Sequence, residues 1–151
     1  MTIQIDSTIL SDMLKQAQSC YPEESCGFII GSQTENEKTV GRYFYPCNND
    51  KEHYRKRRFL IDPMAYQTAE DQADAEGLSI ISIVHSHPDH PDQPSDFDKQ
   101  HAWPGLSYVI IAVKQGSIDT YHSWRLSDDR QHFELEPIHI KETLQGQFQQ
   151  P

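Results

Sequence analysis

The chain has few cysteines, and no two of them have the spacing of a metal-binding pair. Its three cysteines are Cys20, Cys26 and Cys47, and none belongs to a C-x-x-C motif. An odd and sparse set does not suggest a disulfide framework, and it does not support a zinc site made of thiolates. We therefore expect reduced thiols in a reducing compartment.

Long apolar runs and basic charge are also scarce. The N-terminus, MTIQIDSTIL, lacks the basic start and apolar run of a secretory signal. No apolar stretch approaches the ~20 residues that span a bilayer. Lys and Arg number 13 against 23 Asp and Glu, which gives a formal net charge of −10. That charge disfavours nucleic acid as a partner, because phosphates bind basic faces. We expect a cytoplasmic protein without a membrane or nucleic-acid partner.

The residues that are present fit one folded unit of helices and strands. The 151 residues, 36% hydrophobic and 24% charged, suit one domain with one hydrophobic core. Apolar residues recur at helical spacing from Ser7 to Cys20. Asp62 and Pro63 start a second expected helix, which Gly77 is placed to end.

Short runs rich in strand formers lie between and after these helices. They predict strands at residues 26–30, 39–45, 78–84, 108–113, 118–124 and 133–140. The strongest strand prediction is residues 78–84, which are apolar apart from two small serines and should be central in the sheet. We predict an α/β fold of the α+β-like kind, a mixed and mostly antiparallel sheet flanked by helices. The domain should span residues 1–144, followed by a flexible C-terminal tail at 145–151.

Two histidines follow the predicted buried strand at residues 78–84. His85 and His87 lie two apart, and residues two apart in a strand point to the same side. Imidazole is a good zinc ligand, so this spacing suits two ligands of one ion. A single histidine at a strand end would usually be an ordinary polar residue. The same-side pair, followed by Pro88 and a proline-rich loop, favours a metal site.

A second polar cluster, Ser95-Asp96-Phe97-Asp98, follows that loop. Ser-x-x-Asp is also a helix-capping signature, and alone it is better explained by capping. The two explanations are compatible, because a capped helix start would hold Asp98 rigidly enough to serve as a third ligand. Two histidines and one carboxylate leave the fourth zinc position open for water, as in catalytic sites. A nearby carboxylate could then take a proton from zinc-bound water.

Together these residues resemble the signature of the JAMM (MPN+) metalloprotease family. HSHPDHPDQPSDFD, residues 85–98, follows the pattern H-x-H-P, six residues, S-x-x-D. PEESCG, residues 22–27, is similar to the family's P-x-E-x-C-G opening. The resemblance implies an MPN/cytidine-deaminase-like architecture and one zinc ion held by His85, His87 and Asp98.

The resemblance also implies roles for residues beside the metal. Ser95 would polarise the scissile carbonyl or stabilise its oxyanion. Of the two adjacent glutamates, the spacing to Cys26 and Gly27 selects Glu24 rather than Glu23 as the base. Cys26 matches a family position, and we interpret it as a packing residue rather than a nucleophile.

The chain is most similar to the small bacterial members that process ubiquitin-like sulfur carriers, in its short length and in the segments AWPGLSYVIIAV and SWRL. The resemblance implies a peptidase or isopeptidase that cuts the amide bond after the carrier's C-terminal Gly-Gly, releasing cysteine or a short tail. An E1-like activating enzyme or a cysteine synthase would be further partners. Three alternatives stay open: a non-catalytic MPN scaffold, a metallohydrolase of phosphoesters, and an isopeptidase on other ubiquitin-like conjugates.

Five of the 13 basic residues lie between positions 51 and 58. This basic segment could guide an acidic carrier or its carboxylate-bearing tail, with Arg55, Arg57 and Arg58 as candidate substrate-binding residues. From composition alone, a solvated charged loop is the better explanation.

The remaining histidines are scattered along the chain. We expect ordinary surface or packing roles for them, with His90 the least certain because it lies between the ligand segments. They are His53, His90, His101, His122, His132 and His139.

Overall fold

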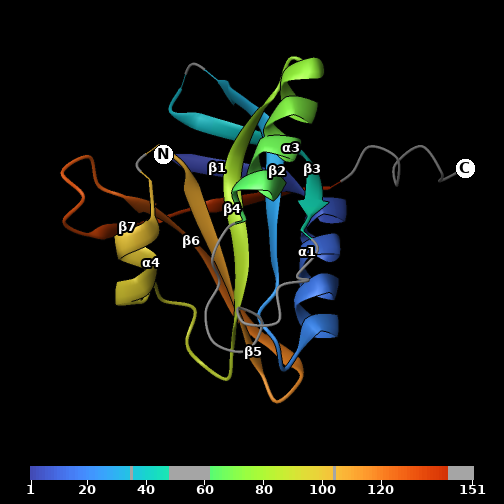
Figure 1. The fold of residues 1–151 in the computed structure, drawn as a ribbon, viewed down its shortest axis with the longest axis vertical. Helices are drawn as coiled ribbons and strands as arrows, with labels where there is room; N and C mark the ends of the chain where they lie inside the picture. The colour runs from blue at the N-terminus through green and yellow to red at the C-terminus, as the bar shows by residue number, and fades with distance from the viewer. Residues whose placement is uncertain (35, 48–61, 104, 143–151) are drawn as a thin grey trace, which may run out of the picture.

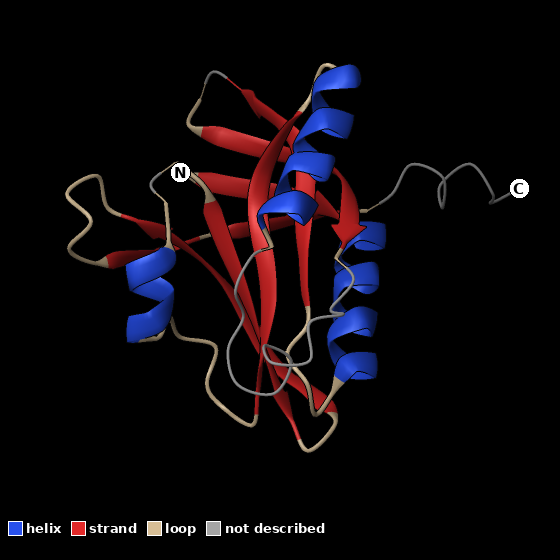
Figure 2. Cartoon of the chain, viewed as in Figure 1, coloured by secondary structure: helices blue, strands red, loops and turns tan. Residues whose placement is uncertain are grey.

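The computed structural model describes residues 1–34, 36–47, 62–103 and 105–142, and the side chains within them except those of Phe97 and His101 (Figure 1). Within these ranges, helices pack on both faces of one eight-stranded mixed sheet, as Figure 2 shows. The predicted fold class is confirmed. The basic segment at 51–58 and the tail at 145–151 lie outside the described residues.

The strand order across the sheet is β7-β6-β5-β4-β2-β3-β1-β8. Among the described strands, four neighbouring pairs are antiparallel and three are parallel. The strands are β1 (Thr2–Asp6), β2 (Cys26–Thr34), β3 (Lys38–Pro46), β4 (Ser79–Pro88), β5 (Ser107–Lys114), β6 (Ser117–Leu126), β7 (Phe133–Glu136) and β8 (Ile138–Lys141).

Helix α1 (Ser7–Cys20) packs on one face of the sheet. It begins at Asp6, whose carboxylate accepts a hydrogen bond from the backbone N–H of Ile9 at 2.8 Å. Ile9, Met13 and Ala17 recur every four residues and are buried, which places them on one helix face. The predicted helix is confirmed at both ends.

Helix α3 (Pro63–Ala75) packs on the opposite face of the sheet, through Ala69 and Ala73. Its N-cap is Asp62, as expected from the sequence. The short helix α4 (Asp96–His101) lies on this same side, because Ala102, just after it, belongs to the same apolar cluster as α3. The metal face of the sheet, as we call it, is the one that α3 and α4 cover.

Strand β4 lies between β2 and β5, and residues 80–86 of it are buried. Its side chains alternate between the two apolar clusters: Ile83 faces α3, and Val84 faces α1. Because the period of a strand is two, His85 and His87 continue the Ile83 side. The strand therefore directs both histidines toward the metal face, where α4 lies.

One strand prediction was wrong, and one strand was missed. Residues 133–140 do not form one strand, because Pro137 divides them into β7 and β8 at opposite ends of the strand order. Proline has no N–H for a ladder, and its carbonyl instead accepts from Ile3 N at 3.1 Å. Strand β1 was not predicted, although buried Ile3 and Ile5 alternate with partly exposed neighbours.

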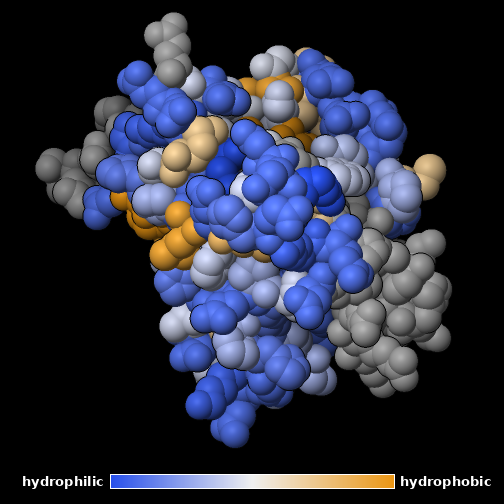
Figure 3. Space-filling view, turned by 90° about the vertical axis from the view of Figure 1, so that its left-hand side faces the viewer, coloured by the Kyte–Doolittle hydropathy of each residue, from blue (hydrophilic) through white to orange (hydrophobic). Residues whose placement is uncertain are grey.

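Among the described residues, none of the helices combines the length and the apolar character needed to cross a membrane. The face drawn in Figure 3 is mostly hydrophilic, which agrees with the acidic composition.

Candidate metal centre

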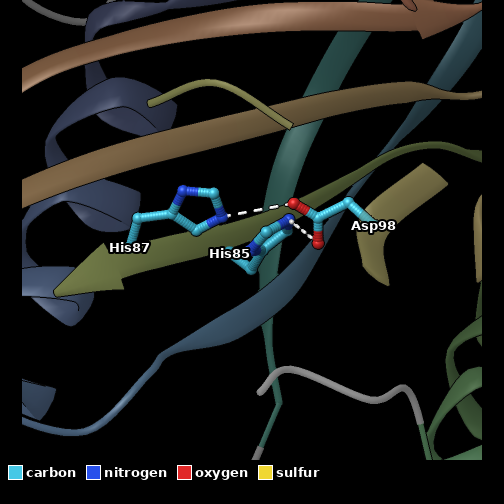
Figure 4. Close-up of side chains that lie close together, drawn as sticks. All are labelled: His85, His87 and Asp98. Atoms are coloured by element: carbon cyan, nitrogen blue, oxygen red, sulfur yellow. Dashed lines mark ion pairs between the residues drawn. The ribbon is translucent and has the colours of Figure 1, made fainter. Parts of the chain in front are cut away.

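Three side chains from two separate segments converge on the metal face (Figure 4). His85 and His87 come from β4, and Asp98 comes from α4. Their ligand atoms all lie within 4.8 Å of one another. Nε2 of His85 is 3.6 Å from Oδ1 of Asp98, and Nε2 of His87 is 3.3 Å from Oδ2. The structure thus brings together the three residues that the sequence predicts as ligands.

The start of α4 holds Asp98 in place through a capping box. The hydroxyl of Ser95 accepts from Asp98 N at 3.1 Å, and Oδ2 of Asp98 accepts from Ser95 N at 2.8 Å. The capping interpretation of Ser95 and Asp98 is therefore confirmed. It coexists with the convergence on the histidines, because the same carboxylate faces both His85 and His87.

The spacing of the donor atoms fits a single zinc ion. Two ligand atoms that each lie about 2.0–2.1 Å from a tetrahedral zinc ion are about 3.3 Å apart. The distances of 3.6 Å from His85 to Oδ1 of Asp98 and 3.3 Å from His87 to Oδ2 of Asp98 are close to that value, and one donor atom from each residue lies within 4.8 Å of the other two. Two imidazole nitrogens and one carboxylate oxygen are also a donor set of the catalytic zinc kind.

The pKa values of the two histidines are shifted in opposite directions. The side chain of His85 is 3% exposed, and burial lowers its pKa to about 4. Burial also disfavours the charged form of His87, but hydrogen bonds to Asp98 and Pro91 raise its pKa above the usual value. Burial opposes ionisation of Asp98, yet the contacts with His87 and His85 hold its pKa well below the usual range. A neutral imidazole and an ionised carboxylate are the forms that bind zinc.

Glu24 lies beside this centre because the segment before β2 is bonded to β4. Ser25 N donates to the hydroxyl of Ser86 at 2.8 Å, and Ser86 N donates to Ser25 O at 3.1 Å. Ser86 lies between the two histidines in the chain, so Glu24 is held close to them. Burial raises the pKa of Glu24 to about 7, with His87 lowering it and Asp98 raising it. Its role as the base stays a prediction.

The bond between Ser25 and Ser86 should contribute measurably to stability. Ser86→Ala removes the hydroxyl that accepts from the backbone N–H of Ser25. Ser25 is a buried residue, 2% exposed, so its N–H would lose this partner inside the protein. We expect the free energy of unfolding to fall by about 1–3 kcal/mol in urea denaturation. The matched control is Ser19→Ala, where an exposed hydroxyl donates to Gln16 O. Equal unfolding midpoints for the two variants would contradict the importance of this bond.

The thiol of Cys26 does not have the properties of a nucleophile. A hydrogen bond with Cys47 and burial both raise the pKa of Cys26, which favours the neutral thiol. This agrees with the packing role expected for it.

The sequence analysis missed a set of contacts that hold the loop between the ligand segments. Nδ1 of His87 donates to Pro91 O at 2.7 Å. The next residue, Asp92, is 7% exposed. Its carboxylate accepts from His122 Nδ1 at 2.6 Å, and its carbonyl accepts from Trp124 Nε1 at 2.9 Å. His122 and Trp124 lie two apart on β6, a spacing visible in the sequence, but their partner is 30 residues away.

The remaining histidines and the basic segment either do not belong to the three converging side chains or lie outside the described residues. His122 is half-exposed, as a surface residue would be, and its ring also donates to the carboxylate of Asp92, a contact that the sequence did not indicate. His132 does fit the expectation, since it lies exposed beside Glu134. Arg55, Arg57 and Arg58, like His53, lie outside the described residues, so their roles stay predictions.

The chain is similar to a known domain family over most of its length. The profile of the family described as "Prokaryotic homologs of the JAB domain" matches residues 6–127. Tail tip assembly protein K of Escherichia phage N15 is 35% identical over 109 residues, or 72% of this chain and 40% of that protein. The desampylase of Haloferax volcanii is 28% identical over 118 residues, or 78% of this chain and 81% of that protein.

A third relative matches over a shorter stretch. The Thermus thermophilus protein described as a "Probable TtuB-protein conjugate cleaving protease" is 42% identical over 55 residues. That match covers 36% of this chain and 37% of that protein, so the chain aligns with less than half of two of these relatives.

Solved structures share the fold to different degrees. A protein of Desulfitobacterium hafniense is similar with a TM-score of 0.81 and 28% identity, over 99% of this chain and all of that one. A JAB1/MPN domain protein of Archaeoglobus fulgidus has a TM-score of 0.56 at 16% identity, over 91% of this chain and 97% of that one. At that identity, the second likeness concerns the fold alone.

Proposed function

The chain belongs to the prokaryotic JAB domain family, the MPN fold family that includes the JAMM metalloproteases, and from this premise we propose that it is a zinc-dependent peptidase or isopeptidase. The observation that carries the proposal is the convergence of His85, His87 and Asp98, with Glu24 held beside them. A scaffold protein would have no need of three donor atoms at zinc spacing.

Each residue of the centre has a separate task in amide hydrolysis. A bound zinc ion supplies Lewis acidity, which polarises a carbonyl and lowers the pKa of water. Glu24 takes a proton from the attacking water and later delivers it to the leaving amine. The O–H of Ser95 donates to the carbonyl oxygen as that oxygen gains negative charge. Its hydroxyl oxygen can accept from Asp98 N at the same time, because a hydroxyl both donates and accepts.

The substrate that we propose is a ubiquitin-like protein, cut after its C-terminal Gly-Gly. Two relatives support this choice, since one is named a desampylase and the other is described as cleaving TtuB-protein conjugates. Within that class we propose a sulfur carrier, from which the enzyme releases cysteine or a short tail. The further proposals are a cytoplasmic location, an E1-like enzyme or cysteine synthase in the same pathway, and a domain that spans residues 1–144.

Cleavage of a carrier protein by the zinc-loaded chain tests this function. The substrate is a ubiquitin-like carrier whose Gly-Gly is followed by a cysteine or a short tail. We expect mass spectrometry to show a product ending in Gly-Gly. A zinc chelator should stop the reaction, and added zinc should restore it, because the water and the carbonyl are activated by the metal. A carrier with Ala-Ala at the scissile end is the control. If carriers, linear or conjugated, stay intact in the presence of bound zinc, the proposed substrate class is wrong.

The match to the phage protein favours a second candidate. Tail tip assembly protein K is 35% identical to this chain over 109 residues, so the same centre could serve as a peptidase in tail assembly. The two candidates share the metal and differ in substrate. Cleavage of a tail tip protein, with carriers left intact, would favour the second.

A further inference from the structure

The loop at residues 89–94, between the two ligand segments, is fastened to β6 by side chains that the proposed mechanism does not use. The fastened residue is Asp92, whose side chain is 9% exposed. Its carboxylate accepts from His122 Nδ1 at 2.6 Å, and its carbonyl accepts from Trp124 Nε1 at 2.9 Å. The carboxylate and the backbone carbonyl of Asp92 are therefore both bonded to β6, a strand of the central sheet.

The neighbour of Asp92 contacts a proposed zinc ligand. The carbonyl oxygen of Pro91 lies 2.7 Å from Nδ1 of His87. A carbonyl can only accept, so Nδ1 must carry the hydrogen in this contact. In a neutral imidazole the lone pair is then on Nε2, the atom that faces Asp98 at 3.3 Å. Pro91 thus selects the tautomer of His87 that can bind a metal on the Asp98 side.

We propose that Asp92, His122 and Trp124 are positioning residues for the metal centre. They hold the peptide that follows Pro91, and thereby keep the Pro91 carbonyl against His87. Carbonyls and carboxylates that orient a histidine ligand generally raise metal affinity. The inference rests on the zinc-binding part of the proposed function and is independent of the substrate.

The other end of the loop offers a matched control. Asp89 accepts from the Tyr21 hydroxyl at 2.6 Å and from Gln115 N at 2.9 Å. These bonds fasten the same loop, but they end two residues before Pro91. Tyr21→Phe therefore removes a loop contact of similar length without loosening the peptide next to Pro91.

Zinc affinity in the absence of substrate is the first measurement. The variants are Asp92→Ala, Trp124→Phe and the control Tyr21→Phe, in the full chain, titrated with zinc against a chelating dye. We expect Asp92→Ala to bind zinc about 10–100-fold more weakly than the wild type, since that is the usual effect of removing a partner that orients a ligand. Trp124→Phe should weaken binding less, because His122 still holds Asp92, and Tyr21→Phe should bind as the wild type does. Asp92→Asn, which keeps an acceptor oxygen for His122, should recover part of the affinity.

The tautomer of His87 is the second measurement, and a purely structural role would not change it. Imidazole ¹⁵N chemical shifts of the metal-free protein are recorded at a pH above the pKa of His87, where the ring is neutral. We expect the wild type and Tyr21→Phe to carry the hydrogen on Nδ1, and Asp92→Ala to show a mixture of both tautomers.

Several results would overturn the inference. Wild-type zinc affinity and an unchanged His87 tautomer in Asp92→Ala would do so, as would equal losses in Asp92→Ala and Tyr21→Phe. If Asp92→Ala does not fold, the zinc affinity of Trp124→Phe is the test, because this variant loses one N–H and keeps an aromatic ring. Wild-type zinc affinity in Trp124→Phe would then overturn the inference. A wild-type chain that binds zinc but cleaves no carrier would refute the proposed substrate and leave this inference standing.

Discussion

Replacing His87 with alanine is expected to abolish both zinc binding and hydrolysis. His87 supplies one of three donor atoms, and its Nε2 lies 3.3 Å from the carboxylate of Asp98. Without it, only two protein ligands remain for the ion. The loss of affinity should exceed the roughly 10–100-fold effect of removing a residue that merely orients a ligand. Zinc content after gel filtration and cleavage of the carrier substrate are the measurements.

A thermal shift provides a readout that needs no substrate. A ligand that binds only the folded state stabilises it, and the stabilisation grows with the ratio of ligand concentration to Kd. Added zinc should therefore raise the Tm of the metal-free wild type and leave that of His87→Ala nearly unchanged.

His90→Ala is the matched control for this experiment. His90 lies in the same loop, it is exposed, and the bond recorded for it is from its backbone N–H to His87 O at 3.4 Å, which alanine retains. We expect this variant to keep zinc and activity. If His87→Ala retains a full equivalent of zinc, the ligand set is wrong. If His90→Ala loses zinc, the loop contributes a ligand that we have not assigned.

The ligand set could be predicted because its signals are local in the sequence. The pairing of His85 with His87 follows from the two-residue period of a strand. Asp98 lies three residues after Ser95, the N-cap of α4, and the family pattern over residues 85–98 adds it to the proposed ligands. The apolar segment before His85 also predicted a central strand, and β4 does lie between β5 and β2 in the sheet. Each of these inferences depends on residues within one short segment of the sequence.

The loop contacts of Asp92 and the placement of β8 were missed, because both depend on contacts between residues far apart in the sequence. Asp92 and His122 are 30 residues apart, and nothing near either residue indicates the other. Likewise, β7 and β8 lie next to each other in the chain but at opposite ends of the strand order. The break at Pro137 could have been expected, because proline has no N–H for a strand ladder. The pairing of β8 with β1 could not have been expected from the residues around it.

Ser95 illustrates how local helix chemistry and site chemistry can share one residue. Its hydroxyl accepts from Asp98 N, and its backbone N–H donates to the Asp98 carboxylate. The capping box therefore places the proposed oxyanion donor beside a proposed ligand. One pattern, S-x-x-D, can therefore cap a helix and also place the two residues to which we assign roles at the metal.

Replacing Glu24 is expected to separate zinc binding from hydrolysis. Glu24→Gln keeps the size of the side chain but removes the carboxylate that would accept the proton of the attacking water, and Glu24→Ala removes it altogether. Since Glu24 is not one of the three converging donors, both variants should retain zinc. We expect kcat/KM for the carrier to fall by about 100- to 10,000-fold, the usual contribution of a general base. Zinc content and hydrolysis are measured on the same preparation.

Glu23→Gln is the control, because it changes the neighbouring carboxylate and leaves Glu24 in place. Glu24 is fixed relative to the histidines by the adjacent Ser25, whose N–H is bound to Ser86. Glu23 lies one residue further from that bond, so we expect its variant to cleave as the wild type does. Full activity in Glu24→Gln together with loss in Glu23→Gln would move the base by one residue and leave the metal site unaffected. Full activity in both would mean that neither carboxylate carries the proton, and that the water is activated by the metal alone.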